Sequence, residues 1–367
     1  MSAPEGTATG GGGDAEIVAH ASLRGVAAYG VLLFHSWTAV FGREAAGGFL
    51  AHGWIFVDLF FMLSGFILFS RYAAWFRSGM RARAGRFLRL RFLRIYPNFL
   101  VWFLAALAFN LAWHAGGPDR PDAVAVGVSV VLHLVMAQSI LPSPILWNTP
   151  LWSLSVEMAL YFAFPAIAFL SARFGGRFWA LALPCAALIP AALIATEGTA
   201  DVWRGGGSVL RGLSGFVIGC ALAQGQARID AMPERLLSLA QAGALIAAAA
   251  AVHLGAEPIA LASFAALVLL TGRNRGAATR WFGWGPLRWL GRISFSFYAC
   301  HMLCMDVIEN VWSAIDPGAG APDAATFLTH AALSTAASLA VGAAGYALVE
   351  RPAHRWARRR DRMDQSA

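Results

Sequence analysis

Residues 23–37, LRGVAAYGVLLFHSW, are apolar enough to lie in a membrane, yet they include an arginine and a histidine. On an α-helix that rises about 1.5 Å per residue, Arg24 and His35 lie roughly 16 Å apart along the axis. That separation is about half the thickness of the hydrocarbon core of a bilayer. A membrane helix with a cation at its edge and a titratable ring near its middle needs a functional explanation.

The composition indicates an integral membrane protein. The 367 residues are 58% hydrophobic and 13% charged, whereas soluble domains carry about 25% charged residues. About eleven apolar segments of roughly membrane-spanning length recur along the chain. We place them at residues 22–42, 53–71, 92–113, 123–141, 150–171, 177–196, 206–224, 235–254, 258–272, 288–312 and 325–349. The sequence therefore predicts an all-α polytopic membrane protein.

The two ends of the chain differ from the apolar part. Residues 1–15 are rich in glycine, and we expect them to be disordered. We assign residues 16–352 to a single transmembrane domain and residues 353–367 to a basic cytoplasmic tail. The net charge is +8, but the arginines cluster beside apolar segments. This pattern favours loops on the cytoplasmic side over a nucleic-acid partner, and the partner that it implies is the lipid bilayer.

The loop charges predict the topology. Residues 71–91 and the C-terminal tail are both strongly basic, which places both ends of the chain in the cytoplasm and requires an even number of crossings. If residues 123–141 do not cross, the basic loops 171–177, 224–235 and 271–280 also lie inside. We therefore predict about ten transmembrane helices and one additional non-spanning or re-entrant segment, in the cell (inner) membrane.

Three arginines are predicted to lie at the cytoplasmic face. Arg24 begins the first span, and Arg91 and Arg94 share a face of the third because they are three residues apart. Arginine binds phosphate in bidentate fashion, so these residues suit a phosphorylated cytoplasmic donor. Arg24 also fits a simple orientation signal at the interface, and Arg91 and Arg94 fit positive-inside charges.

Other polar residues are predicted from mid-membrane outward. A charged residue at the centre of a span costs roughly 2.5–3.5 kcal/mol, so each is a functional candidate. His35 and Ser64 lie near the middle, and Asp58, Glu157 and His301 lie in the outer half. Each also has a structural interpretation: hydrogen-bonded core residues for the histidines, an interface residue or an ion pair for the carboxylates, and close helix packing for Ser64 and Gly65.

The metal interpretation is weaker. Cys300 and Cys304 share a helix face with His301 near by, but no carboxylate or second histidine completes a set of ligands. We therefore expect no metal.

Six ordered motifs resemble the acyltransferase 3 family of integral-membrane O-acyltransferases. They are LRGVAAYGVLLFHS, FVDLFFMLSGFIL, RFLRIYP, LWSLSVEMALYFAFP, GRISFSFYACHM and VERP. Two departures stand out. Val156 precedes Glu157, where the family often has a second acidic residue, and Asp58 lies where the family varies.

The resemblance implies transfer of an acyl group, usually acetyl, from acyl-CoA to a hydroxyl, commonly on a carbohydrate of the envelope. It makes His35 the candidate general base, assisted by Glu157 or Asp58, and assigns Arg24, Arg91 and Arg94 to the donor. We assign four further residues to substrate binding: Ser64, Trp152, Tyr161 and His301.

Two other functions remain open from the sequence. A transporter or flippase of a lipid-linked sugar would also need a polar passage through the membrane. A catalytically inactive membrane subunit would not need both His35 and the inner arginines.

Overall fold

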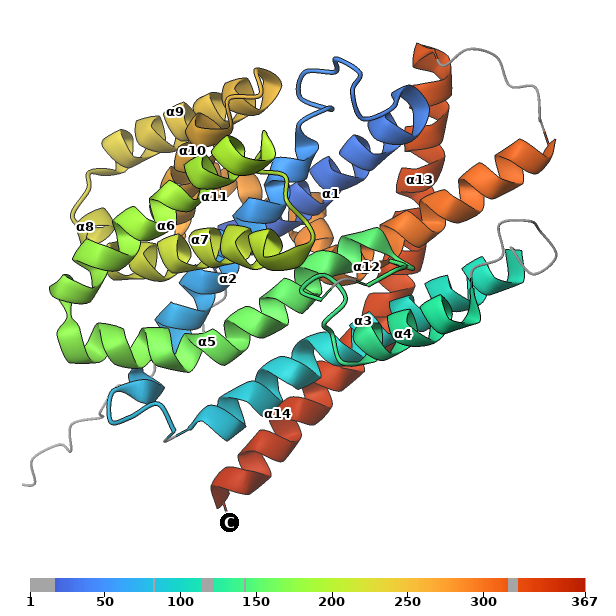
Figure 1. The fold of residues 1–367 in the computed structure, drawn as a ribbon. Coiled ribbons are helices and arrows are strands. Elements are labelled where there is room, and N and C mark those ends of the chain that lie inside the picture. Colours follow the sequence, from blue (N-terminus) through green and yellow to red (C-terminus); the bar gives the residue numbers. More distant parts are fainter. Residues whose placement is uncertain (1–16, 82, 114–121, 142, 316–322, 367) are drawn as a thin grey trace, which may run out of the picture.

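The computed structural model describes residues 17–81, 83–113, 122–141, 143–315 and 323–366 (Figure 1). These residues form helices and no strand, which confirms the all-α prediction. The predicted disordered tail at residues 1–15 lies outside the described residues. The helices are α1 (Val18–Phe41), η1 (Gly53–Ile55), α2 (Phe56–Tyr72), η2 (Ala73–Phe76), α3 (Ala84–Trp113), α4 (Ala123–Leu134), η3 (Thr149–Leu151), α5 (Trp152–Phe174), α6 (Gly176–Glu197), α7 (Gly205–Gln224), α8 (Gln226–Asp230), α9 (Glu234–His253), α10 (Glu257–Thr271), α11 (Ala277–Phe282), α12 (Gly285–Ile315), α13 (Ala324–Gly345), η4 (Tyr346–Glu350) and α14 (Arg351–Ser366).

Seven helices of the described chain are long and apolar enough to cross a membrane. They are α2 with η1 and η2, α3, α5 with η3, α6, α7, α9, and α13 continuing through η4 into α14. This confirms a polytopic membrane protein. The other predicted crossings coincide with α1, α10 and α12, which form helices but are not among the seven. Ten crossings therefore stay a prediction.

The segment predicted not to cross contains a short helix. α4 has 12 residues and rises about 18 Å, less than the roughly 30 Å of a bilayer core. Asp122 caps its first turn by accepting a hydrogen bond from the backbone N–H of Ala125 at 2.9 Å. After Leu134 the chain turns, and Met136 has a positive φ of 55°. This geometry favours a segment that enters and leaves on one side.

Glycines let two pairs of central helices touch through their backbones. A Cβ atom at Gly65 of α2 would overlap the carbonyl oxygen of Phe216 in α7, and one at Gly219 would overlap that of Met62. Gly25 of α1 meets the backbone of Gly291 in α12 in the same way. Small residues allow membrane helices to approach this closely. The structural interpretation of Gly65 is therefore confirmed.

The basic ends of the chain lie on one side of the bundle. Figure 1 shows the connection between α2 and α3 at the same side as the C-terminus, whereas α3 and α12 both end on the opposite side. α14 packs beside the first turns of α3 (Figure 1). The arrangement agrees with the prediction that the basic residues 71–91 and the C-terminal tail face the same compartment.

Candidate functional site

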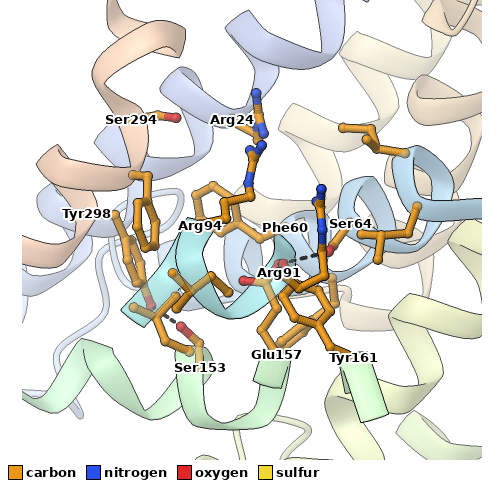
Figure 2. A pocket seen from close by; sticks show the side chains of 16 residues that line it. Arg24, Phe60, Ser64, Arg91, Arg94, Ser153, Glu157, Tyr161, Ser294 and Tyr298 are labelled. Atoms are coloured by element: carbon orange, nitrogen blue, oxygen red, sulfur yellow. Dashed lines mark hydrogen bonds between the residues drawn. The ribbon is translucent and has the colours of Figure 1, made fainter. Parts of the chain in front are cut away.

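A cavity of about 100 Å³ lies among α1, α2, α3, α5 and α12. It is lined by residues that are far apart in the sequence, and their side chains converge on one space (Figure 2). Six of the ten residues predicted for the site line it: Arg24, Ser64, Arg91, Arg94, Glu157 and Tyr161. The sequence motifs on four helices therefore meet at one place.

Arg91 is held at one end of its guanidinium group. Its Nη2 donates to the hydroxyl of Tyr72 at 2.7 Å, and the guanidinium carbon lies 4.8 Å from the centre of the Tyr72 ring. Its Nε is buried and has no hydrogen-bond partner among the described residues. Buried donors are normally paired, so this N–H is available to a hydrogen-bond acceptor that the described residues do not supply.

Glu157 is oriented by two hydroxyl groups. Ser64 donates to its Oε1 at 2.8 Å, and Tyr161, one helical turn further along α5, donates to the same oxygen at 2.6 Å (Figure 2). Both of these hydrogen bonds end on Oε1, so neither hydroxyl occupies Oε2. A carboxylate accepts several hydrogen bonds, so Glu157 has capacity left for a substrate N–H or O–H.

The cavity carries an excess of positive charge. Among the described residues that line it are three arginines, Arg24, Arg91 and Arg94, and one carboxylate, Glu157. Guanidinium groups bind phosphate with paired N–H donors. The arginine end of the cavity is therefore suited to a phosphorylated ligand.

The two predicted histidines form a pair. The ring centres of His35 on α1 and His301 on α12 are 5.3 Å apart. Nδ1 of His301 lies 2.6 Å from the backbone carbonyl of Tyr298. A carbonyl only accepts, so Nδ1 carries the proton, and Nε2 of the neutral ring is an acceptor. That Nε2 is buried without a partner in the described chain.

Tyr298 connects this pair to the cavity. Its ring centre lies 5.5 Å from that of His301, and its side chain lines the cavity (Figure 2). Its hydroxyl donates to the carbonyl of Pro150 at 3.0 Å and lies 2.9 Å from the hydroxyl of Ser153. His35 and His301 do not line the cavity themselves, but a continuous series of rings leads to them from its wall.

Asp58 and Trp152 lie elsewhere. Asp58 accepts hydrogen bonds from Nε and Nη2 of Arg211 at 2.8–3.2 Å. Both side chains are buried, and both line a second cavity of about 190 Å³. Trp152 offers its ring to the same guanidinium group at 5.2 Å. The geometry gives Asp58 and Trp152 a structural task around Arg211 and does not bring them to Glu157.

Arg211 is the main residue that the sequence analysis missed. It also donates to Asp201 at 2.7 Å and to the backbone carbonyl of Trp54 at 3.2 Å. The signal was present, because Arg211 is a charged residue inside the apolar segment 206–224. By contrast, Ser153, Ser294 and Tyr298 line the main cavity, but neutral residues in an apolar helix carry no such signal.

The described residues offer no group of three or more His, Cys, Asp or Glu side chains that could hold a metal ion.

Comparison with known proteins identifies the family. The family described as "Acyltransferase domain" matches residues 22–347. The chain is 39% identical over 153 residues to the acyltransferase MdmB of Streptomyces mycarofaciens, covering 39% of this chain and 37% of that protein. It is 35% identical over 99 residues to protein 2 in the picA locus of Rhizobium radiobacter, covering 27% of this chain and 48% of that protein.

The matched regions thus span less than half of each of these two relatives. No solved structure matches the chain. The family match, in contrast, covers nearly the whole of the described bundle. It includes all the motifs named in the sequence analysis except the last one, VERP. The chain therefore belongs to the acyltransferase 3 family.

Proposed function

We propose that this protein moves an acyl group, in the first instance acetyl, from cytoplasmic acyl-CoA to a hydroxyl of an extracytoplasmic or membrane-associated carbohydrate. The observation that carries the proposal is the cavity itself. It joins three arginines, Arg24, Arg91 and Arg94, to the oriented carboxylate of Glu157, and its wall leads to the histidine pair. An anionic donor and a hydroxyl acceptor both find complementary groups there.

The donor would bind with its phosphates at the arginine end. Arg24 and His35 lie 11 residues apart on α1, which is about 16 Å along the axis and within about 20° of the same face. One extended substrate can therefore contact both. In this arrangement the arginines hold the phosphates, and the pantetheine arm carries the thioester toward His35.

His35 would act as the general base. The imidazole removes the proton of the acceptor hydroxyl while the hydroxyl oxygen attacks the thioester carbonyl. The carbon–sulfur bond then breaks, and the proton passes to the departing thiolate, so the products are an ester and free CoA thiol. General base catalysis of this kind contributes about 10²–10⁴ in rate. His301 packs against His35 and serves as a positioning residue.

Glu157 would act on the substrate directly. Ser64 and Tyr161 already occupy one of its oxygens, and the other is available to accept a hydrogen bond from an amide N–H of pantetheine or from the acceptor. Ser64 itself is engaged with Glu157, which favours direct transfer over an acyl-enzyme formed on this serine.

A transporter or flippase, the alternative function that the sequence left open, would not explain why the chain belongs to an acyltransferase family. The experiment that separates the two functions is turnover. Purified full-length protein in nanodiscs, supplied with acetyl-CoA and an envelope glycan fraction, should release CoA thiol in equal amount to the ester formed. Envelope glycans from cells lacking the protein should have lost the corresponding acetyl esters. Unchanged glycans together with no release of thiol would reject the proposal.

We also propose that both termini are cytoplasmic and that the protein resides in the cell (inner) membrane. The basic connection between α2 and α3 lies on the same side as α14 (Figure 1). Since basic segments are retained in the cytoplasm, this side would be the cytoplasmic one. Acyl-CoA is made there, so the donor would enter from the side on which the arginines lie.

A further inference from the structure

The directions of the helices give the main cavity two distinct ends. α5 runs beside α2 in the same direction, because the ring of Phe61 meets that of Trp152, and the ring of Phe76, just beyond α2, meets that of Phe164. α12 runs in the opposite direction, away from the side on which α2 joins α3 (Figure 1). The residues that line the cavity can therefore be ordered along it by their positions on these helices.

Phe60 and Tyr298 lie at the end of the cavity that is remote from Arg91. Arg91 marks the inner end, because it donates to Tyr72 in the last turn of α2. Phe60 also lines the cavity, but it lies 12 residues earlier on α2, about 18 Å along the axis. Tyr298 is the last of the described α12 residues that line the cavity, and its ring centre lies 5.4 Å from that of Phe60 (Figure 2). These two rings therefore close the outer end.

The histidine pair lies just beyond this outer end. The ring centre of Tyr298 is 5.5 Å from that of His301, which in turn packs on His35. Neither histidine is among the described residues that line the cavity, and His301 is fully buried. A thioester that enters from the arginine end therefore reaches Phe60 and Tyr298 before it reaches His35.

The two rings at the outer end are held differently. The hydroxyl of Tyr298 donates to the carbonyl of Pro150 at 3.0 Å and lies 2.9 Å from the hydroxyl of Ser153. These contacts fix the Tyr298 ring, which is only 5% exposed. Phe60 has no polar group that could anchor it, and it is only partly buried. The size of the Phe60 side chain can therefore change without the loss of a hydrogen bond.

We propose that Phe60 determines the length of the acyl chain that the protein accepts and restricts it to short chains such as acetyl. The proposal rests on the proposed function, because it requires the donor phosphates at the arginines and the thioester at the opposite end. The acyl chain then lies against the Phe60 ring, which fills the space that a longer chain would need. The neighbouring lining residues Phe61 and Leu154 are apolar and suit a hydrocarbon chain. A hydrophobic pocket distinguishes substrates that differ by one methylene group by about 10- to 200-fold.

The test compares acetyl-CoA with butyryl-CoA as donors. The full-length protein in nanodiscs receives each donor together with the envelope glycan fraction, and the ester formed and the CoA thiol released give kcat/KM for each donor. The wild type should prefer acetyl-CoA by at least about tenfold. Phe60→Ala should raise the ratio of kcat/KM for butyryl-CoA to that for acetyl-CoA by at least about tenfold. Phe60→Leu, which keeps more of the apolar volume, should raise this ratio by less, and it decides the test if Phe60→Ala does not fold.

Phe69→Ala is the matched control. It removes the same side chain from the same helix, but Phe69 packs on Trp179, with ring centres 5.6 Å apart, and is not among the described residues that line the cavity. Its ratio of kcat/KM for the two donors should equal that of the wild type.

Three results would overturn the assignment of Phe60 and leave the proposed function intact. The first is a wild-type ratio in the folded Phe60 variants. The second is an equal rise of the ratio in Phe69→Ala, because the whole bundle would then have loosened. The third is a wild-type protein that uses both donors equally well. If the wild type releases no thiol from either donor, the proposed function fails and the inference fails with it, and this result is distinguishable because it does not depend on any variant.

Discussion

The substitution Asp58→Asn tests whether the Asp58 carboxylate is structural or catalytic. The geometry assigns it to Arg211, so Asp58→Asn should lower stability and leave acyl transfer intact in the folded protein. Only 2% and 8% of the Arg211 and Asp58 side chains are exposed. Removing one member of a buried ion pair costs about 3–5 kcal/mol. Because Asp201 still pairs with Arg211 at 2.7 Å, we expect the lower end, about 3 kcal/mol, or roughly a hundredfold in the folding equilibrium.

The same cluster predicts an order of effects. Arg211→Met should destabilise more than Asp58→Asn, because it leaves two carboxylates, Asp58 and Asp201, without their shared cation. Arg43 also pairs with Asp201, but its side chain is 51% exposed, so Arg43→Ala should cost no more than about 1 kcal/mol. Denaturant titration in mixed micelles, followed by tryptophan fluorescence, measures all three. An Asp58→Asn protein with wild-type stability and a hundredfold loss of turnover would refute the structural assignment.

Two other predictions concern the donor and the topology. Arg91→Ala should weaken acyl-CoA binding by roughly 10- to 150-fold in calorimetry, the equivalent of about 1.5–3 kcal/mol, and Arg91→Lys should restore it only in part because lysine lacks the bidentate fork. Tyr72→Phe is the control, because it removes the hydroxyl that Arg91 contacts and keeps the charge of Arg91. If Arg91→Ala bound acyl-CoA with unchanged affinity, Arg91 would be a topology signal only. In a background lacking Cys185, cysteine at the exposed position Ala46 should react with an impermeant thiol reagent in intact cells, whereas cysteine at exposed Ala231 should be protected. The reverse labelling would overturn the predicted orientation.

The fold was predictable where hydrophobic length decides it. All ten predicted crossings correspond to helices, and seven of them satisfy length and apolarity alone. α1 and α12 carry the polar residues of the site, among them Arg24 and His301, and this polarity keeps them out of the seven. The same residues that mark function therefore weaken the signal for a span.

The charged members of the site could be named from the sequence, but their arrangement could not. Depth along the helices placed Arg24, Arg91 and Arg94 at the cytoplasmic face and Glu157 in the outer half, whereas the structure brings all four to the wall of one cavity. Depth alone placed Asp58 in the outer half, where its nearest cation could not be known before α2 and α7 packed together. Their contact depends on Gly65 and Gly219, and it is this contact that gives Asp58 its partner, Arg211.

The roles of the neutral residues came only from the fold. Ser64 was expected to serve either helix packing or the substrate, and its hydroxyl holds Glu157 while the adjacent Gly65 packs on α7. Tyr298 had no sequence signal of its own, yet it forms the link between His301 and the cavity. Such links depend on which helix faces meet, and one sequence does not specify those faces.

The most direct test of the central claim is the single-turnover rate of His35→Ala. The variant should fold, because removing a neutral ring leaves no buried unpaired charge. It should bind acyl-CoA nearly as the wild type does, since the arginines that hold the phosphates are untouched. The acceptor in this assay is the glycan whose acetyl esters are lost in cells without the protein. Acyl transfer to this glycan should fall by at least about a hundredfold. A folded His35→Ala protein that keeps a tenth or more of the wild-type rate would contradict the account, because His35 would then not be the base.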